Sequence, residues 1–327
     1  FILNECYDLF RSYIGLKRLL IKNNKNNLLL SQHALGFNGL AGELATIKKL
    51  TSLLITHGSH VKQTNKYSRL AWDYSNRILI NAKFTYTAMQ TPIAYDYFCN
   101  ERDKRAKPLI TGPLIYGIKN KISTSKNLRQ SLFRHNSKKF IILHAGTPKD
   151  WNFFRPINYE TMDEYISNLI EIINAIKSNK KIFLAIRFRE SNNLTLSILK
   201  NLLPKFNNYG IYNKGNFMDY LHCSDLLVSY SSTTIEEALI NKKPVALFNP
   251  KGDYFHLKGA LLKKDKKNIN INHIYNIKNR DDLEWSLNWL QKNHSIKSNS
   301  LDWKKYSFDT KQNNQFEDLI HETLKNI

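Results

Sequence analysis

The chain has 327 residues, 42% of them hydrophobic, which is enough for two domains of ordinary size, each with its own core. No apolar run approaches the roughly 20 residues that cross a bilayer, and nothing at the start is typical of a signal peptide. The three cysteines (Cys6, Cys99 and Cys223) are far apart and lack metal-ligand spacing, so we expect reduced thiols in a cytoplasmic compartment.

The formal net charge is +22 at pH 7, which indicates an acidic partner or reflects the Lys-, Asn- and Ile-rich composition of an AT-rich coding sequence. The lysines are scattered, and the densest run, 263–267, falls in a predicted loop. The sequence has no zinc, helix-turn-helix or RNP pattern and no basic stripe interleaved with aromatic residues. We therefore expect no nucleic-acid partner and favour attraction to an anionic membrane surface or a charged glycan.

The first part of the chain, residues 1–130, predicts a small α/β domain. Helices are expected at Leu9–Ile21 and Gly39–Leu50 and from Ile93, and short strands at Leu28–Ser31, Leu53–Thr56, Thr85–Met89 and Leu109–Thr111. These elements are too few for a complete doubly wound domain, and the first residue is Phe1, so we expect an upstream portion to be missing. The polar, basic segment 117–136 is the expected linker.

From Lys138 onward, predicted strands and helices alternate. The strands are Phe140–His144, Ile182–Arg187, Tyr209–Tyr212, Leu226–Ser229 and Val245–Phe248, and the helices are Glu160–Lys177, Leu194–Leu203, Phe217–His222, Ile235–Ile240 and Asp281–Gln291. Alternation of this kind predicts a parallel sheet with helices on both faces and ligands at the carboxyl ends of the strands. We expect this second domain to span residues 138–300, and residues 301–327 to form a C-terminal helix that packs back on the first domain.

The run from Ser224 to Pro250, SDLLVSYSSTTIEEALINKKPVALFNP, is the most informative segment. It predicts a strand, a turn of small hydroxyl residues (Ser231–Thr234, the hydroxyl turn), a helix and a second strand. Free backbone N–H groups and the positive end of the helix dipole make such a turn a phosphate or pyrophosphate site. Hydroxyl residues also cap helices without any ligand, which is the alternative. The position in the alternating half favours phosphate.

Two arginines, Arg187 and Arg189, follow another predicted strand. Alternating positions put both guanidinium groups on the same side of the chain, which is a fork suited to phosphate or carboxylate. A surface salt bridge with Glu190 is the alternative.

Candidate catalytic groups come from the first domain. His57 follows a predicted strand in Thr56-His57-Gly58, a position that suits a general base or a phosphate donor, although strand-end histidines are more often structural. Glu43, which follows the loop 33–39, is a candidate base or nucleophile, and Asp73 is a second candidate nucleophile.

The sequence lacks the motifs GxGxxG after a strand, GxxxxGK[ST], HExxH, GxSxG and DxD. Their absence argues against nicotinamide cofactors, P-loop chemistry, zinc hydrolysis and the α/β-hydrolase triad. We therefore expect no cofactor and no metal, and we expect backbone N–H groups and arginines to stabilise a phosphate leaving group.

Taken in order, the histidine–glycine turn, TAMQTPIAYDYF, PLITGPLIYG, the arginine-bearing strand end and the run 224–250 resemble GT-B glycosyltransferases over roughly residues 53–250. The likeness is to bacterial surface-polysaccharide enzymes, namely the capsule and lipopolysaccharide transferases that use Kdo or sialic acid and the CDP-glycerol glycerophosphotransferases. Non-hydrolysing UDP-N-acetylglucosamine 2-epimerases share the architecture. The resemblance implies two Rossmann-type parallel-sheet domains that face a cleft, the first of them incomplete here.

The resemblance also implies roles for individual positions. The donor phosphate would be held by Ser231, Ser232 and Thr233, the ribose would lie near Glu237, the base near Asn213 and Lys214, and the diphosphate or an acidic sugar near Arg187 and Arg189. His57 would face the cleft from the acceptor domain. The sequence departs from the sialyltransferase pattern because it has no His-Pro pair, and its paired arginines suit a keto-acid donor such as CMP-Kdo.

The sequence therefore predicts a metal-independent glycosyltransferase that moves a sugar from a CMP-Kdo-like donor or a UDP-sugar to a surface polysaccharide or lipid-linked glycan. We expect a cytoplasmic enzyme, peripheral at the inner face of a bacterial membrane. An inverting reaction would use His57 or Glu43 as the base, and a retaining one Glu43 or Asp73 as the nucleophile. Two alternatives stay open, a UDP-N-acetylglucosamine 2-epimerase and a non-catalytic GT-B-like module that binds glycan or nucleotide.

Overall fold

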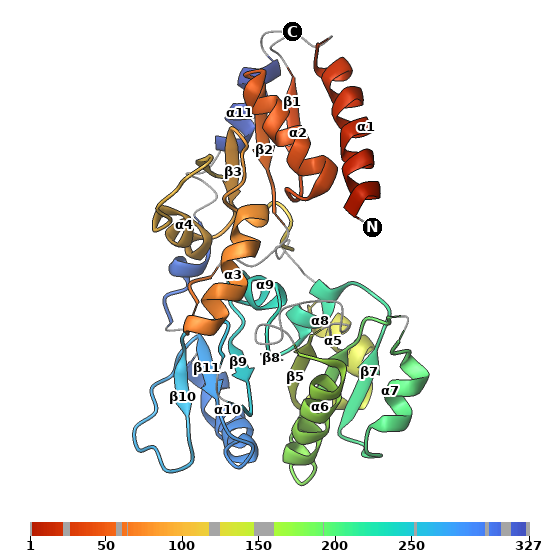
Figure 1. Cartoon of the computed structure of the whole chain (residues 1–327). Coiled ribbons are helices and arrows are strands. Elements are labelled where there is room, and N and C mark those ends of the chain that lie inside the picture. The colour runs from red at the N-terminus through yellow and green to blue at the C-terminus, as the bar shows by residue number, and fades with distance from the viewer. Residues whose placement is uncertain are drawn as a thin grey trace. The chain divides into compact units, whose positions relative to one another are not determined.

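The computed structural model describes residues 2–21, 27–56, 61–63, 65–117, 125–146, 160–191, 193–251, 254–297, 301–308 and 315–324. The chain forms two compact units (Figure 1). Unit 1 consists of residues 1–62, 72–116 and 304–327, and unit 2 of residues 63–71 and 117–303. Each unit is built on its own parallel sheet, which confirms the predicted α/β fold class. Among the helices that the structure describes, none is long and apolar enough to cross a membrane.

Unit 1 has a four-stranded parallel sheet in the order β1-β2-β3-β4. Its strands are β1 (Leu28–Ser31), β2 (Thr51–Leu54), β3 (Tyr86–Met89) and β4 (Lys107–Ile110). Its helices are α1 (Ile2–Ile21), α2 (Gly36–Ile47), α4 (Pro92–Cys99) and α11 (Gln315–Leu324), with a 3-10 turn, η3 (Lys304–Tyr306), while α3 (Lys66–Leu79) has residues in both units. The four predicted strands are present, and α3 was not predicted.

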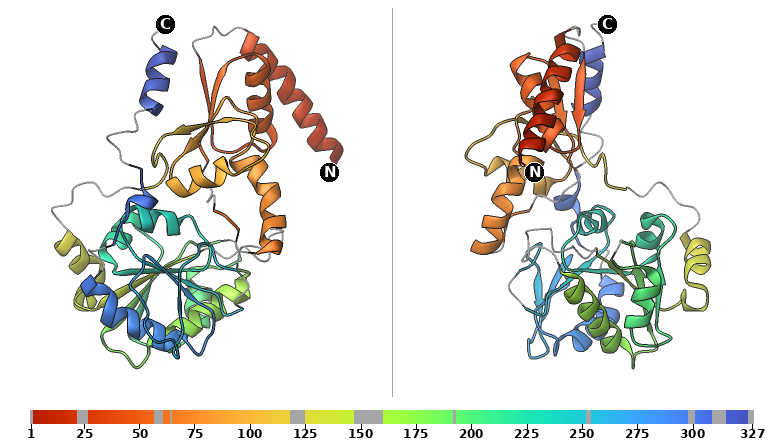
Figure 2. Two further views of the ribbon diagram at one scale, coloured as in Figure 1. Left: turned by 90° about the vertical axis from the view of Figure 1, so that its left-hand side faces the viewer. Right: turned by 45° about the vertical axis from the view of Figure 1, so that its right-hand side comes forward.

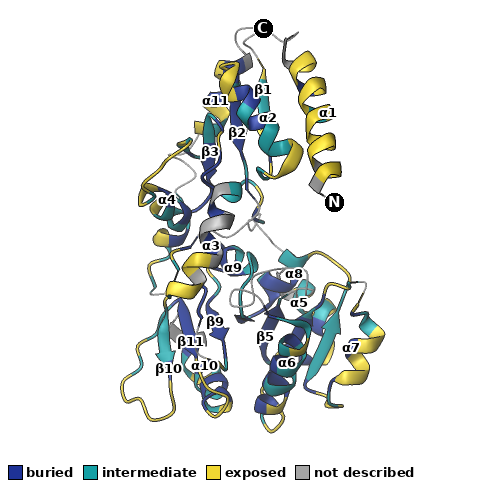
Figure 3. Ribbon diagram, viewed as in Figure 1, coloured by how far each residue is buried: buried dark blue, intermediate teal, exposed yellow. Residues whose placement is uncertain are grey.

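Side chains from both faces of the unit 1 sheet are buried. Leu53 and Leu54 of β2 point to opposite faces because side chains alternate along a strand, and both are fully buried. On one face Leu53 packs with Leu319 of α11, and the backbone N–H of Ile110 donates to the Gln315 amide oxygen at 2.8 Å. Helix α1 packs on α2 through Leu16, but most of its remaining surface is exposed (Figure 3).

Unit 2 has a seven-stranded parallel sheet in the order β10-β11-β9-β8-β5-β6-β7. The strands are β5 (Phe140–Ala145), β6 (Ile182–Arg187), β7 (Tyr209–Tyr212), β8 (Leu226–Ser229), β9 (Val245–Phe248), β10 (Ala260–Leu262) and β11 (Ile274–Ile277). The strands predicted in this half are all present, and β10 and β11 extend the sheet beyond them. The chain adds strands in one direction from β5 to β7 and then returns to place β8 on the other side of β5.

Helices cover both faces of the unit 2 sheet (Figure 2). They are α5 (Ser125–Phe133), α6 (Met162–Ile176), α7 (Leu196–Leu202), α8 (Phe217–Cys223), α9 (Thr234–Ile240) and α10 (Leu283–Lys297), with a 3-10 turn, η1 (Arg134–Asn136). On one face, Ile142, Leu184 and Val228 share a core with α6, α7 and α10. Contacts of α8 with β5 and of α9 with β8 and β9 cover the other. Burial on both faces explains why these strands are continuous apolar runs.

The segment 117–136, expected as a linker, contains helix α5, so that expectation was wrong for its second half. The Arg129 guanidinium donates to both carboxylate oxygens of Asp225, at 3.0 and 2.7 Å, and to the carbonyl oxygens of Cys223, Ser137 and Lys139. These hydrogen bonds hold α5 against the start of β8. The sequence of this segment is polar and was therefore interpreted as a linker. Helix α5 is polar because charge pairing, as well as its apolar residues, holds it in place.

Candidate functional site

The hydroxyl turn lies at the carboxyl end of β8, where the strand order of unit 2 reverses between β5 and β8. The Ser229 hydroxyl donates to the carbonyl oxygen of Ala145 at 2.7 Å and so joins the ends of these two strands. In open parallel sheets this reversal is the place where ligands bind, because the loops that follow the two strands diverge. The fold therefore places the hydroxyl turn at the most favourable ligand position of the sheet.

The turn also caps the helix that follows it. The Ser232 hydroxyl accepts the backbone N–H of Thr234 at 3.3 Å, and the Ser232 carbonyl accepts the N–H of Ile235 at 3.1 Å. Thr233 makes no side-chain cap hydrogen bond, and the buried hydroxyl oxygen of Thr234 has no hydrogen-bond partner among the described residues. Ser231, Ser232 and Thr233 are half-buried. The cap and phosphate interpretations are thus both compatible with the geometry.

A buried histidine–carboxylate pair lies beside the turn. Nε2 of His256 is 3.1 Å from Oε1 of Glu236, and the two side chains are 1% and 3% exposed. The other ring nitrogen of His256 lies 3.1 Å from the Tyr254 hydroxyl and 3.4 Å from the Ser231 hydroxyl. If Nε2–H donates to Glu236, Nδ1 accepts from one of the two hydroxyls. Glu236, on the first turn of the helix that follows, is thus part of a buried network that holds Ser231.

Glu237, the expected ribose contact, is bound to backbone. Its carboxylate accepts the N–H of Gly117 at 3.3 Å, while the Asn241 amide donates to the Gly117 carbonyl at 2.7 Å. Burial raises the pKa of Glu237, and the Gly117 hydrogen bond partly offsets that rise. The carboxylate has a second oxygen, so the Gly117 contact does not exhaust its capacity to accept hydrogen bonds.

The two arginines that were expected to form a fork, Arg187 and Arg189, have different surroundings. Arg187 donates to the carbonyl oxygens of Tyr212 at 2.8 Å and Gly215 at 2.7 Å, and its guanidinium lies over the ring of Tyr220. Gly215 has φ +87°, a conformation that other residues rarely adopt. Arg189 is exposed. The structure therefore commits Arg187 to holding the loop after β7 and leaves Arg189 as the exposed cation of the pair.

The expected base-binding residues belong to this same loop. The Asn213 amide donates to the Glu190 carboxylate at 2.9 Å, and Lys214 is exposed while its carbonyl accepts the Tyr220 hydroxyl at 3.1 Å. Glu190 thus pairs with Asn213, and no ion pair of Glu190 with an arginine occurs among the described residues. The carboxyl ends of β6 and β7 are joined by these polar contacts.

Of the three catalytic candidates of the first domain, Glu43 is the one whose side chain the structure describes. Glu43, on α2, forms an ion pair with Lys83 at 2.9 Å, with both side chains about half exposed. Asp73 lies on α3, and its side chain is outside the described part of the structure. His57 lies outside the described residues. Within the described ranges, no three His, Cys, Asp or Glu side chains are grouped to hold a metal ion.

A buried polar cluster at the end of β5 was missed by the sequence interpretation. Burial raises the pKa of Glu160 to about 7, although the Asn168 amide donates to it at 2.7 Å. Burial lowers the pKa of His144 to about 4, and neither its Nδ1 nor the Tyr165 hydroxyl has a partner among the described residues. Glu160 directly precedes the capping box Thr161–Glu164, which was the one sequence signal for its position.

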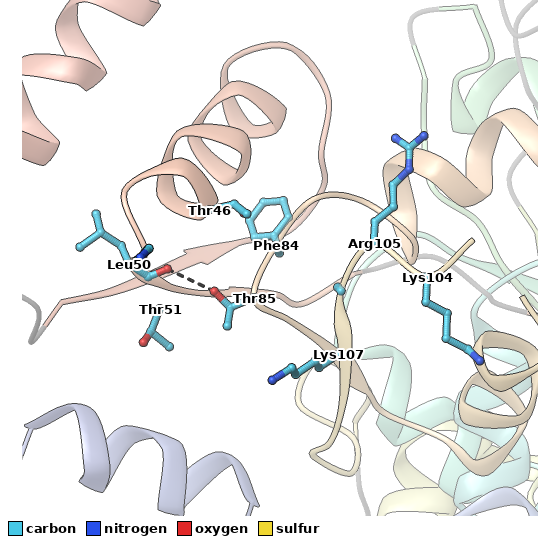
Figure 4. A pocket seen from close by; sticks show the side chains of 10 residues that line it. Thr46, Leu50, Thr51, Phe84, Thr85, Lys104, Arg105 and Lys107 are labelled. Atoms are coloured by element: carbon cyan, nitrogen blue, oxygen red, sulfur yellow. Dashed lines mark hydrogen bonds between the residues drawn. The ribbon is translucent and has the colours of Figure 1, made fainter. Parts of the chain in front are cut away.

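Among the described residues, cavities occur in both units, and one of about 760 Å³ opens beside β7, where Phe133, Tyr209, Tyr212 and Tyr220 line it. A small one of about 130 Å³ lies by the hydroxyl turn and is lined by Tyr230, Asn249, Pro250, Lys251, Glu164, Asn168 and Arg280. A larger, open one of about 480 Å³ lies in unit 1, where Thr46, Thr51, Thr85, Phe84 and Lys107 surround it (Figure 4). It lies at the amino ends of β2 and β4, away from the carboxyl edge that binds ligands in parallel sheets. We therefore place the candidate site at the hydroxyl turn.

Comparisons with models of known families and with curated proteins find no match. Solved structures do match. The chain is similar to the UDP co-structure of S. aureus MnaA, with a TM-score of 0.61 and 13% identity over 99% of this chain and 82% of that one. It is similar to a putative UDP-N-acetylglucosamine 2-epimerase from Listeria monocytogenes, with a TM-score of 0.55 and 15% identity over 88% and 70%. Anabaena Alr3699/HepE, in complex with UDP and glucose, matches with a TM-score of 0.51 and 13% identity over 95% and 81%.

Proposed function

Because this chain has the GT-B-like fold that its sequence resemblance implied, we propose that it is a glycosyltransferase that uses a nucleotide-sugar donor. Unit 2 holds the donor, and unit 1 holds the acceptor. The donor phosphates bind at the hydroxyl turn through backbone N–H groups and the hydroxyls of Ser231, Ser232 and Thr233, without a metal ion.

One observation carries the proposal: the hydroxyl turn follows β8 at the reversal of strand order in the unit 2 sheet. Glu237 lies one turn into the same helix, where a carboxylate can accept hydrogen bonds from the ribose hydroxyls. The loop that Arg187 holds, 212–216, lies at the carboxyl end of β7 and supports the proposed place of the base near Asn213 and Lys214.

The substrates follow from chemistry and from the structural neighbours. Two of these neighbours were solved with UDP, which favours a UDP-sugar, while the exposed Arg189 suits an acidic sugar such as Kdo. The acceptor is a surface polysaccharide or lipid-linked glycan. The net charge of +22 holds the enzyme near an anionic surface, at the cytoplasmic face of a bacterial membrane. The general base or nucleophile is His57, Glu43 or Asp73, and Glu43 would have to leave Lys83 to act.

A transfer assay tests this function. The chain is incubated with a panel of CMP- and UDP-sugars and a lipid-linked glycan acceptor in EDTA, and released nucleotide and extended glycan are quantified. Ser232→Ala is expected to lower transfer at least tenfold, because a hydrogen bond to a charged group is lost. Thr195→Ala is the matched control, since Thr195 also accepts a capping N–H at 3.3 Å but at another helix. Equal rates for wild type and Ser232→Ala with every donor contradict the proposal.

A second candidate is a UDP-N-acetylglucosamine 2-epimerase, which the likeness to the Listeria structure favours. Incubation with UDP-N-acetylglucosamine alone, followed by proton NMR of the sugar, separates the two functions. The epimerase forms an epimer without any acceptor, whereas the transferase leaves the donor sugar unchanged until an acceptor is added. A non-catalytic module binds nucleotide or glycan and does neither.

A further inference from the structure

Helix α1 of unit 1 carries a continuous stripe of exposed apolar side chains. Leu3, Tyr7, Phe10 and Ile14 are 84%, 61%, 59% and 36% exposed. At 100° per residue these four positions fall within about 60° of the helix circumference, so they form one line along it. Leu16, the residue that anchors α1 on α2, lies about 150° from the centre of that line. The stripe is therefore a second apolar face, distinct from the one that packs on α2.

Cations border this stripe on both sides. Lys17 lies next to it at one edge, and Arg11 and Arg18 lie at the other, within about 40° of the nearest stripe residue. All three are exposed. The Arg11 guanidinium is 5.7 Å from the centre of the Tyr7 ring, and the Lys17 ammonium is 5.8 Å from that of Tyr13, so the charges lie beside the aromatic side chains. Asp8, the nearest described acidic residue on α1, is about 130° from the stripe centre.

We propose that this stripe is a docking surface for an anionic lipid membrane, with α1 lying along the lipid surface. Apolar and aromatic side chains enter the boundary between headgroups and acyl chains, while flanking Lys and Arg bind anionic headgroups, and α1 has both in the required arrangement. A second copy of the chain fits less well, because a two-fold pairing of the stripes would bring cationic borders together. The inference deepens the membrane partner proposed above, but its test does not depend on sugar transfer.

Vesicle flotation of the full chain tests this surface. Wild type is expected to float with vesicles of 30% phosphatidylglycerol in phosphatidylcholine at 0.1 M salt, and to dissociate from them at 0.5 M salt. Phosphatidylcholine alone should bind it at least tenfold more weakly, since each cation contributes about a fivefold gain on an anionic surface. Phe10→Gln with Ile14→Gln should lower the partition coefficient at least tenfold. Arg11→Gln with Lys17→Gln should lower it at least tenfold on the anionic vesicles at 0.1 M salt and should reduce the salt dependence.

The matched control is Ile198→Gln with Leu202→Gln, which removes two exposed apolar side chains, 44% and 49% exposed, from α7 of unit 2. This variant should float like wild type, and circular dichroism and sedimentation velocity are run on all variants. Wild type that stays unbound, or α1 variants that bind like wild type, overturn the proposal. Lipid-free wild type that sediments as an oligomer, with α1 variants that sediment as monomers, overturns it in favour of a self-association surface.

Discussion

The Arg187 guanidinium donates to the carbonyl oxygen of Gly215 at 2.7 Å, across the loop that follows β7. A second donor of the same group reaches the Tyr212 carbonyl at 2.8 Å, and the plane of the group lies over the Tyr220 ring. The planar guanidinium has several N–H donors in fixed positions, so it can donate to two carbonyl oxygens at once, and a lysine ammonium cannot reproduce this geometry. Arg187 is thus a positioning residue for the loop proposed to hold the nucleotide base.

Replacing Arg187 with alanine should lower the free energy of unfolding by about 2 kcal/mol, because two charge-assisted hydrogen bonds and a cation–π contact are lost. Arg187→Lys should recover less than half of this. Arg189→Ala, which removes an exposed side chain, should change stability by less than about 0.5 kcal/mol. Urea denaturation of the three variants measures these differences. Equal stability of Arg187→Ala and Arg189→Ala contradicts the assigned role.

The buried pair His256 and Glu236 should be strongly coupled. His256→Gln removes the imidazole that lies 3.1 Å from the buried Glu236 carboxylate, which should cost about 3 kcal/mol. The double variant with Glu236→Gln should be less destabilised than the sum of the single changes, by at least about 1 kcal/mol. His294→Gln is the control, because it removes another buried histidine, whose Nδ1 lies 2.8 Å from the Tyr275 hydroxyl and not beside a carboxylate that the structure describes. Additive losses in chemical denaturation argue against a direct interaction between the two side chains.

The buried carboxyl of Glu160 should make stability depend on pH. Its pKa is raised from 4.5 to about 7 by burial, so the folded chain binds this proton more tightly than the unfolded chain does. Protonated Glu160 therefore contributes about 3 kcal/mol to the free energy of unfolding below about pH 4.5. This contribution is lost as the pH rises to about 7. Glu160→Gln should therefore gain stability relative to wild type across this interval.

Paired urea titrations of wild type and Glu160→Gln between pH 4.5 and pH 8 isolate this effect, because every other titrating group is common to both proteins. Among those groups is His144, whose lowered pKa makes stability fall as the pH drops from 6.5 to about 4. A stability difference between the two proteins that stays constant over the interval contradicts the raised pKa of Glu160.

The ion pair of Arg129 with Asp225 should be the main interaction that holds α5 in place. Asp225→Asn should cost about 2 to 3 kcal/mol, since the guanidinium loses its bidentate partner and the Ile141 N–H its charged acceptor. Glu171→Gln, which breaks the more exposed pair with Arg280 at 3.6 Å, should cost less than about 0.5 kcal/mol. Similar losses for both variants in thermal denaturation would mean that α5 is not held in this way.

The strands and helices that could be predicted from the sequence are those whose hydrophobic pattern follows directly from burial. Strands β5, β6 and β8 are buried on both faces and therefore read as unbroken apolar runs. Helix α3 was missed because a polar residue, Asn76, occupies the buried line between Trp72 and Ile80 and breaks the apolar period. Strand β10 was missed because it is only three residues long, and β11 because a polar residue, Asn276, interrupts its apolar run.

The hydroxyl turn was predictable because its position depends on local order along the chain, a strand followed by hydroxyls and a helix. The partners of its side chains were not, because they are distant in sequence. His256 and Ser231 are 25 residues apart, and Glu237 meets the N–H of Gly117 across 120 residues. The role of Arg187 was likewise hidden, since a fork of arginines looks the same whether its acceptors are phosphates or backbone carbonyls.

We predict that the hydroxyl turn of unit 2 holds the phosphates of a nucleotide sugar without metal, and a thermal-shift titration measures this binding. CMP, CDP, UDP and GDP are titrated in EDTA against wild type, Ser232→Ala with Thr233→Ala, and Thr195→Ala. We predict that at least one nucleotide raises the melting temperature of wild type and of Thr195→Ala in a saturable way, and that the double variant needs at least tenfold more of it. If none of the four nucleotides stabilises wild type, or if the double variant responds at wild-type concentrations, the claim is contradicted.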